Sequence, residues 1–237
     1  MLSDYLIMVP VLAIASIASV KTGKLTAIAG LTGFTGALLI FAGAGCTGIA
    51  MLAAFFVLGT AATSLGMNEK YKLGIAEKNK GRRTAGQVMA NAGVAAAMAL
   101  LVLILPQQAG LFQLMIAASF ASAAADTLSS ELGNLYGKRF YNILTFKKDK
   151  RGLDGVVSAE GTLAGLVGSV IIALIYSAKF SFGKETVWII IAGTAGNLFD
   201  SVLGASLERR HQLNNNAVNF LNTAIAAFIA LLLYYLQ

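Results

Sequence analysis

Two acidic residues stand in the middle of strongly apolar stretches of the chain. Asp126 lies within the segment 111–132 and Asp200 within the segment 187–207, and neither segment contains a lysine or an arginine. An ionised carboxylate at the centre of a membrane helix costs about 2.5 to 3.5 kcal/mol on insertion scales, and more when it has no partner. The two aspartates therefore indicate a functional site, with a buried ion pair or an interhelical hydrogen bond as the structural alternative.

Each aspartate belongs to a row of small or polar residues spaced mainly by three or four positions. Four such rows are, in chain order, Arg83, Gln87 and Asn91; Ser119, Ser122, Asp126, Ser130 and Gly133; Asn197, Asp200, Ser201, Gly204 and Glu208; and Asn215, Asn219 and Asn222. Because successive helical residues are rotated by about 100°, each row lies along one face of its helix. We expect the four faces to meet inside a bundle, although any single asparagine could equally be an interhelical contact.

Two further acids are candidates for the same site. Glu131 follows Asp126 by five residues, so it points about 140° away on an ideal helix unless the helix loosens near Gly133. Glu160 begins another apolar segment, where a carboxylate could equally complement the helix dipole. The predicted catalytic residues are therefore Asp126, Asp200, Glu131 and Glu160, and the first three are also the predicted metal ligands.

Basic residues precede the segments that carry the polar faces. Carboxylate oxygens bind Mg²⁺, whereas arginines bind phosphate oxygens in a bidentate manner. Acids next to basic loops therefore predict a site for Mg²⁺ and a polyphosphate, although each lysine alone could equally be a determinant of membrane topology. The predicted phosphate- and nucleotide-binding residues are Lys78, Arg82, Arg83, Gln87, Asn91, Arg151, Asn215 and Asn219.

The elements that position these residues are predicted to be membrane-spanning helices. The chain of 237 residues is 57% hydrophobic and 12% charged, a bias that excludes an ordinary soluble domain. Apolar segments of about 16 to 24 residues, long enough to cross a bilayer, recur eight times. They are residues 5–20, 25–42, 48–66, 86–105, 111–132, 156–178, 187–207 and 217–236.

The predicted fold is all-α: a polytopic bundle of about eight transmembrane helices that forms a single integral membrane domain over residues 1–237. A weak internal repeat of helix hairpins is also visible. The segments that begin at Gly86 and Gly155 both follow a basic loop, and the helices that return from them carry Asp126-Thr127 and Asp200-Ser201.

The basic residues alternate between connectors. Only Lys179 and Lys184 among the 18 lysines and arginines lie in connectors on the predicted outer side, which leaves 16 on the other side. By the positive-inside rule, the loops 67–85, 134–155 and 208–216 are cytoplasmic and both termini lie outside. We therefore expect a multi-pass protein of the cell membrane with its active site on the cytoplasmic side. The net charge of +7 then reflects topology and contact with membrane lipids, and predicts no nucleic-acid partner.

Other site types are disfavoured by the residue counts. Cys46 and His211 are the only cysteine and the only histidine, so the chain offers neither a thiolate metal cluster nor a cluster of histidines. The phosphate-loop pattern GxxxxGK[ST] is absent. Any nucleotide is therefore expected to bind in a different kind of site.

Five motifs follow one another in the part of the chain from about residue 78 to about residue 223. They are residues 81–93, 125–133, 152–162, 200–205 and 214–219. Together they resemble the multi-pass membrane family that contains plant and cyanobacterial phytyl-phosphate kinase and vertebrate transmembrane protein 19. Asp154 and Glu160 are more similar to the kinase branch, whereas Leu128 stands where the family pattern has a bulky aromatic residue.

The resemblance implies a kinase that uses a nucleoside triphosphate, with CTP as the favoured donor. Its acceptor would be a prenyl monophosphate such as phytyl or geranylgeranyl phosphate, which becomes the diphosphate. A CTP-dependent lipid cytidylyltransferase is the nearest enzymatic alternative, and an ion-coupled transporter is the alternative outside enzymes. The polar faces fade toward the predicted outer side, which disfavours a transporter, and the cost of burying Asp126 and Asp200 disfavours a structural scaffold.

Overall fold

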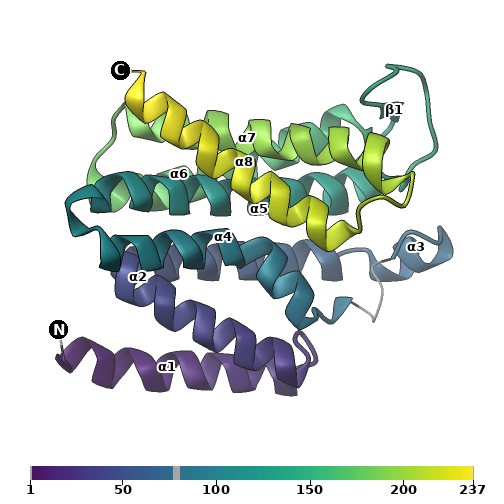
Figure 1. Cartoon of the computed structure of the whole chain (residues 1–237). Helices are drawn as coiled ribbons and strands as arrows, with labels where there is room; N and C mark the ends of the chain where they lie inside the picture. Colours follow the sequence, from purple (N-terminus) through teal and green to yellow (C-terminus); the bar gives the residue numbers. More distant parts are fainter. Residues whose placement is uncertain (1, 77–80, 237) are drawn as a thin grey trace.

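The computed structural model describes residues 2–76 and 81–236 and consists almost entirely of helices laid side by side (Figure 1). Within the described residues, seven helices are long and apolar enough to cross a membrane. They are α1 (Leu2–Lys21), α2 (Ala27–Ser64), α4 (Ala85–Ile104), α5 (Ala109–Tyr136), α6 (Ala159–Phe180), α7 (Lys184–Leu203) and α8 (Asn215–Tyr235). The protein is therefore a polytopic all-α membrane protein, as its composition predicts.

The second and third predicted spans are joined in the single 38-residue helix α2. At Gly45 the backbone leaves the helical region (φ 59°, ψ −153°), a conformation that glycine adopts without steric penalty. Figure 1 shows the two arms of α2 running in opposite directions from this bend. The eight predicted apolar segments thus correspond to seven helices, because the turn between two of them is only a bend.

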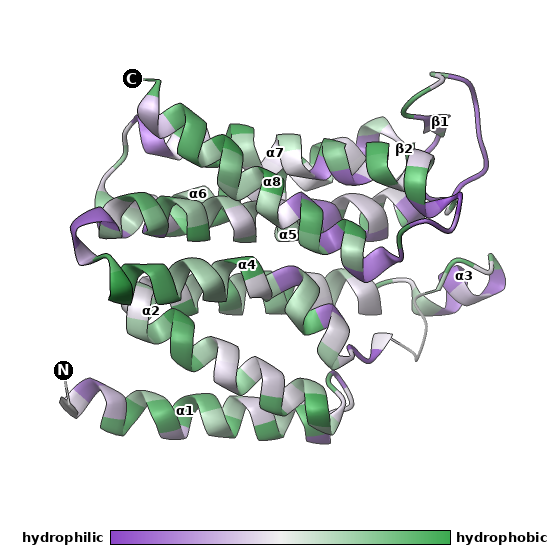
Figure 2. Cartoon of the chain, viewed as in Figure 1, coloured by the Kyte–Doolittle hydropathy of each residue, from purple (hydrophilic) through white to green (hydrophobic). Residues whose placement is uncertain are grey.

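The two ends of the bundle differ in charge. Figure 1 shows both termini and the connection between α6 and α7 at one end, and α3, β1 and the start of α8 at the other. Figure 2 shows hydrophilic residues gathered on the latter elements, which we call the basic end. This arrangement matches the predicted alternation of loops. The assignment of the basic end to the cytoplasm stays a prediction.

Short elements lie at the basic end, in the predicted loops or at the adjoining ends of the predicted spans. Helix α3 (Met67–Lys72) lies within the predicted loop 67–85, and strands β1 (Tyr141–Asn142) and β2 (Val156–Val157) pair in antiparallel fashion across the loop 134–155. The turn η3 (Gly204–Glu208) widens the end of α7 into a π-helical turn. At the opposite end, η2 (Pro106–Gln108) connects α4 to α5.

Helix α5 forms the centre of the bundle, with its side chains buried along most of its length. Its contact with α6 depends on glycines. A Cβ atom at Gly165 would lie 2.9 Å from the carbonyl oxygen of Ala125, and one at Gly168 would lie 3.0 Å from that of Ala124. Backbones that approach this closely restrict sliding and rotation of the two helices. The packing therefore sets the direction in which Asp126 points from α5.

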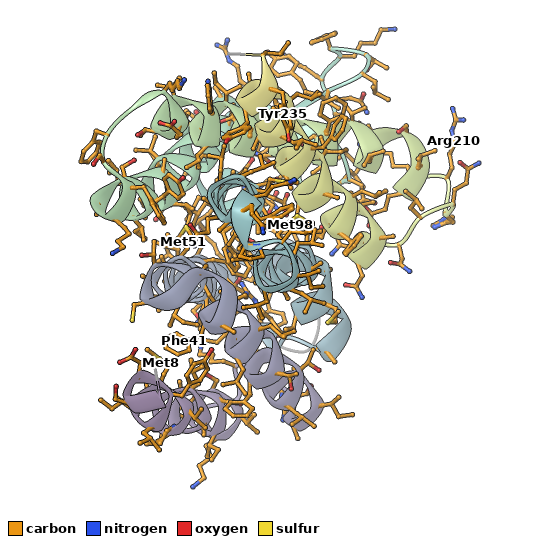
Figure 3. The ribbon with its side chains drawn as sticks, turned by 60° about the vertical axis from the view of Figure 1, so that its left-hand side comes forward. Met8, Phe41, Met51, Met98, Arg210 and Tyr235 are labelled. Atoms are coloured by element: carbon orange, nitrogen blue, oxygen red, sulfur yellow. The ribbon has the colours of Figure 1, made fainter. Side chains whose placement is uncertain are left out.

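Helix α1 packs at the edge of the bundle, against the first arm of α2. The Tyr5 and Phe41 rings meet edge to face with centroids 5.1 Å apart, and the Ser16 hydroxyl donates a 2.8 Å hydrogen bond to the Gly30 carbonyl. Figure 3 shows Met8 and Phe41 in the seam between these two helices. Helix α1 is thus remote from the polar rows, which lie on α4, α5, α7 and α8.

Candidate active site

A pocket of about 1040 Å³ lies where the four polar faces reach the basic end. Residues of α4, α5, α7 and α8 line it, together with the loops that precede α6 and α8. Its walls contain eight of the predicted site residues: Asp126, Glu131, Asp200, Arg83, Gln87, Asn91, Asn215 and Asn219. The structure therefore brings residues from distant parts of the chain to one cavity.

Asp126 of α5 and Asp200 of α7 both line this pocket, with their carboxyl groups close enough to interact with each other. The buried amide of Asn222 donates a 2.7 Å hydrogen bond from Nδ2 to Oδ1 of Asp200. Oδ1 of Asn222 accepts a 3.1 Å hydrogen bond from the hydroxyl of Ser122. Side chains from α5 and α8 therefore orient Asp200 of α7. Asn222 lies on a predicted polar face but was not among the predicted site residues.

Two carboxyl groups in contact repel each other unless a proton or a cation lies between them. Among the residues that the structure describes, no group of three or more histidines, cysteines, aspartates or glutamates is arranged to hold a metal ion. Mg²⁺ does not require such a group, because it is commonly held by one or two carboxylates and completes its octahedron with water and phosphate oxygens. Asp126 and Asp200 are the residues that could bind it.

Two acids that were not among the predicted site residues also line the pocket. Glu208 lies in the wide turn η3, and Asp154 lies in the loop before β2. Their carboxylates interact electrostatically with each other and with Asp200. Glu208 was part of the predicted polar face on α7, so the three- and four-residue spacing could have identified it. Asp154 lies in a loop, so helical spacing could not identify it as a site residue, and its place in the motif 152–162 was the only signal for it.

Glu131 lines the pocket but has a partner of its own. Helix α5 stays helical through Gly133 to Tyr136, so it does not loosen there. Oε2 of Glu131 lies 2.5 Å from Nζ of Lys70, which also donates a 2.8 Å hydrogen bond to the Ala62 carbonyl. Lys70 is only 1% exposed. The charge of Glu131 is therefore balanced by a buried lysine that sequence analysis treated only as part of a basic loop.

The pocket lining also includes amide groups and a guanidinium group. Arg83 stacks over the rings of Phe55 and Phe56, at 5.0 and 5.7 Å from their centroids. Stacking of this kind orients a guanidinium group. The Asn91 amide donates a 2.9 Å hydrogen bond to the Gln87 carbonyl. Its buried Oδ1 has no hydrogen-bond partner among the residues that the structure describes.

The first turns of the site helices are fixed by caps. Thr84 and Gln87 form a reciprocal capping box at the start of α4, with a 2.8 Å bond from the Thr84 amide to Oε1 of Gln87. Oδ1 of Asn214 accepts a 2.9 Å hydrogen bond from the amide of Ala217 at the start of α8. Such caps typically stabilise a helix by about 1 kcal/mol. The pocket residues at both helix starts are thereby held in place.

Three predicted residues do not line the pocket, and one lies outside the described residues. Nε of Arg82 donates a 3.1 Å hydrogen bond to the Leu25 carbonyl, whereas Arg151 lies over the Phe140 ring at 5.7 Å. Glu160 lies in the first turn of α6 and accepts a 3.4 Å hydrogen bond from the Lys138 amide. Each lies within two positions of a lining residue in the sequence. Lys78 belongs to the segment 77–80, which the structure does not describe.

Comparison with known proteins identifies relatives over most of the chain. Residues 10–227 match the family described as integral membrane protein DUF92. The chain is 37% identical over 199 residues to protein VTE6, chloroplastic, of Arabidopsis thaliana. The matched region covers 80% of this chain but only 59% of VTE6. The chain is 38% identical over 201 residues to the uncharacterized membrane protein sll0875 of Synechocystis, which covers 82% of this chain and 76% of that protein.

An archaeal relative extends this comparison. The uncharacterized membrane protein MJ0933 of Methanocaldococcus jannaschii is 34% identical over 186 residues, which covers 78% of this chain and 75% of that protein. No solved structure matches the chain. The similarity thus reaches plants, cyanobacteria and archaea, and it spans the helices that form the pocket.

Proposed function

The chain belongs to the integral membrane protein family DUF92, the multi-pass family indicated by its five motifs, and we propose that it is a prenyl-phosphate kinase. In this proposal it transfers the γ-phosphoryl group of a nucleoside triphosphate, with CTP as the expected donor, to a prenyl monophosphate. Phytyl and geranylgeranyl phosphate are the expected acceptors. Because the chain spans only 59% of the length of VTE6, donor and acceptor are both proposals for this chain.

The observation that carries the proposal is the polarity of the pocket. The acid pair of Asp126 and Asp200 stands in the same cavity as the stacked guanidinium of Arg83 and a set of amides. Phosphoryl transfer depends mainly on positioning and on stabilising charge. Mg²⁺ held by the two aspartates would shield the phosphate charges. Arg83, Gln87, Asn91, Asn215 and Asn219 would bind phosphate oxygens and the nucleotide.

The proposed reaction needs no residue to remove a proton from the acceptor. An oxygen of the prenyl monophosphate forms a bond to the γ-phosphorus, and the bond between that phosphorus and the β–γ bridging oxygen breaks, so that CDP leaves. A phosphate monoester is already largely ionised at pH 7, since its second pKa is about 6. The role proposed for Asp126 and Asp200 is therefore cation binding. Arg83 would stabilise the charge that develops on the transferred group.

The position of the pocket suits an acceptor with a lipid tail. It opens at one end of the helices, where the headgroup layer of a bilayer would lie, and the tail of a prenyl phosphate could stay in lipid. The positive-inside rule places this end on the cytoplasmic side, where soluble nucleotides are available. Cytoplasmic orientation is accordingly part of the proposal.

The packing of the opposite end supports an enzyme over an ion-coupled carrier. Between α4, α5 and α8 the bundle is filled by a buried apolar cluster of Val94, Val102, Leu111, Phe112, Met115 and Ala227. A carrier must give its site access to both sides of the membrane. The pocket instead has its polar lining at the basic end, which favours chemistry at one membrane surface.

The test is turnover by the purified protein. It would be incubated in detergent with CTP labelled at the γ-phosphate, Mg²⁺ and geranylgeranyl or phytyl monophosphate, and the lipid product identified by mass. A labelled prenyl diphosphate with release of CDP supports the kinase. A CMP-lipid with release of pyrophosphate would show a cytidylyltransferase, and absence of lipid-dependent turnover with any nucleotide would contradict both. Glu185→Gln, at the opposite end of α7, is a matched charge control for the acid variants.

A further inference from the structure

The hairpin between β1 and β2 holds an aromatic side chain out in solvent. Phe146 is 79% exposed and has φ 54°, in the left-handed region that non-glycine residues seldom adopt. Its amide donates a 2.9 Å hydrogen bond to the Asn142 carbonyl, and the Asn142 amide donates one of 2.9 Å to the Lys147 carbonyl. The ring is thus presented by a closed turn. We call residues 144–148 the hairpin tip.

The hairpin tip also carries positive charge. Lys147 and Lys148 lie in it and Lys150 follows, and all three are exposed. The acid between them, Asp149, is turned toward Arg209, whose Nη1 lies 2.9 Å from its Oδ2. The backbone amide of Lys150 and the Arg209 side chain hold the pKa of Asp149 below its usual value. The negative charge nearest the tip is therefore balanced by Arg209.

The connections of the hairpin keep it near the membrane surface. Its arms continue directly into α5, which ends at Tyr136, and α6, which begins at Ala159, and both helices are candidate membrane spans. Figure 1 shows β1 and its loop reaching beyond the outline of the bundle, beside the basic end of α7. In a bilayer crossed by α5 and α6, the tip would lie at the surface on the side of the basic end.

We propose that the hairpin tip is an anchor that binds the surface of an anionic bilayer. Phe146 and Leu144, the latter 46% exposed, enter the headgroup layer, while Lys147, Lys148 and Lys150 bind lipid phosphates. An apolar side chain next to several lysines matches the apolar interior and the negative charge of such a surface, because apolar groups partition into the acyl boundary and lysines are attracted to anionic lipids. This inference does not depend on the proposed kinase activity.

The anchor is mechanically connected to the pocket. The loop that leads from the hairpin tip to β2 supplies Gly152, Leu153 and Asp154 to the pocket wall. Nε of Arg209 donates a 2.6 Å hydrogen bond to the Asp154 carbonyl, which fastens this wall to the end of α7. Contact of the tip with lipid would therefore hold the pocket rim at the depth of the lipid headgroups.

The test uses tryptophan fluorescence. Trp188 is the only tryptophan, so Trp188→Phe gives a silent background into which Phe146→Trp introduces one probe. The full chain would be placed in nanodiscs of phosphatidylcholine alone or mixed with phosphatidylglycerol, each with lipids brominated near the headgroup. We expect blue-shifted emission and bromine quenching that increase with the anionic lipid. Lys147→Gln and Lys148→Gln should each lower the ratio of lipid-bound to free tip about five-fold, because one lysine near an anionic surface contributes about 1 kcal/mol of binding.

The matched controls each remove one lysine elsewhere at the basic end. Lys21→Gln and Lys72→Gln, made singly, change the net charge as much as either hairpin variant does, in exposed positions outside the hairpin, and should leave quenching of the probe unchanged. Water-like emission without quenching in both kinds of nanodisc would overturn the proposal. Equal quenching with and without anionic lipid would overturn it too, since the lysines would then have no role.

Discussion

Removal of the buried Lys70 ammonium is predicted to destabilise the protein strongly. In Lys70→Met the Glu131 carboxylate, whose side chain is 15% exposed, loses its 2.5 Å partner and the Ala62 carbonyl loses a donor. Breaking a buried ion pair from one side typically costs about 3 to 5 kcal/mol, because one charge is left without compensation. For a chain of this size about 1 kcal/mol corresponds to roughly 2 to 4 °C in Tm, so we expect a decrease of about 6 to 20 °C.

The double variant separates pairing from packing. In Lys70→Met with Glu131→Gln no charge remains buried, and replacing both partners of a buried pair by neutral groups is often close to neutral. We therefore expect the double variant to regain most of the lost stability. Thermal unfolding in one detergent, followed by size-exclusion chromatography with fluorescence detection, would measure all variants. Lys72→Met, two positions along α3 and exposed, should stay within about 0.5 kcal/mol of the wild type.

Two results would refute this reasoning. A loss below about 1 kcal/mol in Lys70→Met would mean that water or another group compensates Glu131, as at a surface ion pair. A double variant that is as unstable as the sum of the single variants would show that the two side chains act independently, because coupled partners are non-additive. Either result would leave Glu131 available to the acid pair next to it.

Three further predictions concern the pocket and the hairpin. Asp126→Asn and Asp200→Asn should each abolish turnover and its dependence on Mg²⁺ while the protein elutes as the wild type does; near-normal turnover in both would make the acids structural. Arg83→Ala should lower kcat by about 10²- to 10³-fold, as for loss of a group that stabilises transition-state charge, with little change in KM for the lipid; an effect on KM alone would assign it to substrate binding. The backbone amide of Lys150 and the Arg209 side chain lower the pKa of Asp149, so the stability that this carboxylate contributes is present above the unfolded pKa and is lost as pH falls through the folded pKa. Thermal unfolding of wild type and Asp149→Asn should therefore converge in acid and diverge toward neutral pH, and parallel curves would contradict this.

The membrane architecture could be predicted from the chain by itself, because the bilayer imposes a simple local rule. A span needs about 20 apolar residues with its backbone bonded internally, and basic residues collect on one side, so composition and charge order define helices and ends. The sequence also divided residues 25–66 into two apolar segments, and the bend at Gly45 falls between them, although the structure joins them in one helix. The hairpin of β1 and β2 did not, because its strands pair only once α5 and α6 bring them together.

The buried state of Lys70 was decided by the tertiary structure. In sequence it is one of six basic residues in a loop, and it acquires its role from Glu131, which lies 61 positions away. A positive charge near a membrane boundary has the same sequence signature whether it faces water or a buried acid. Only the docking of α3 against α5 distinguishes the two cases.

The acid pair shows the same division within the site. Helical periodicity determined that Asp126 and Asp200 lie on the polar faces of their own helices, because the angle per residue is a local property of each helix. The contact between them was not determined by that angle. It depends on how α5 and α7 are rotated against each other, which the close packing of glycines and alanines and the bond from Asn222 decide. Sequence therefore specified which residues face inward, and the packing of the helices decided which of them meet.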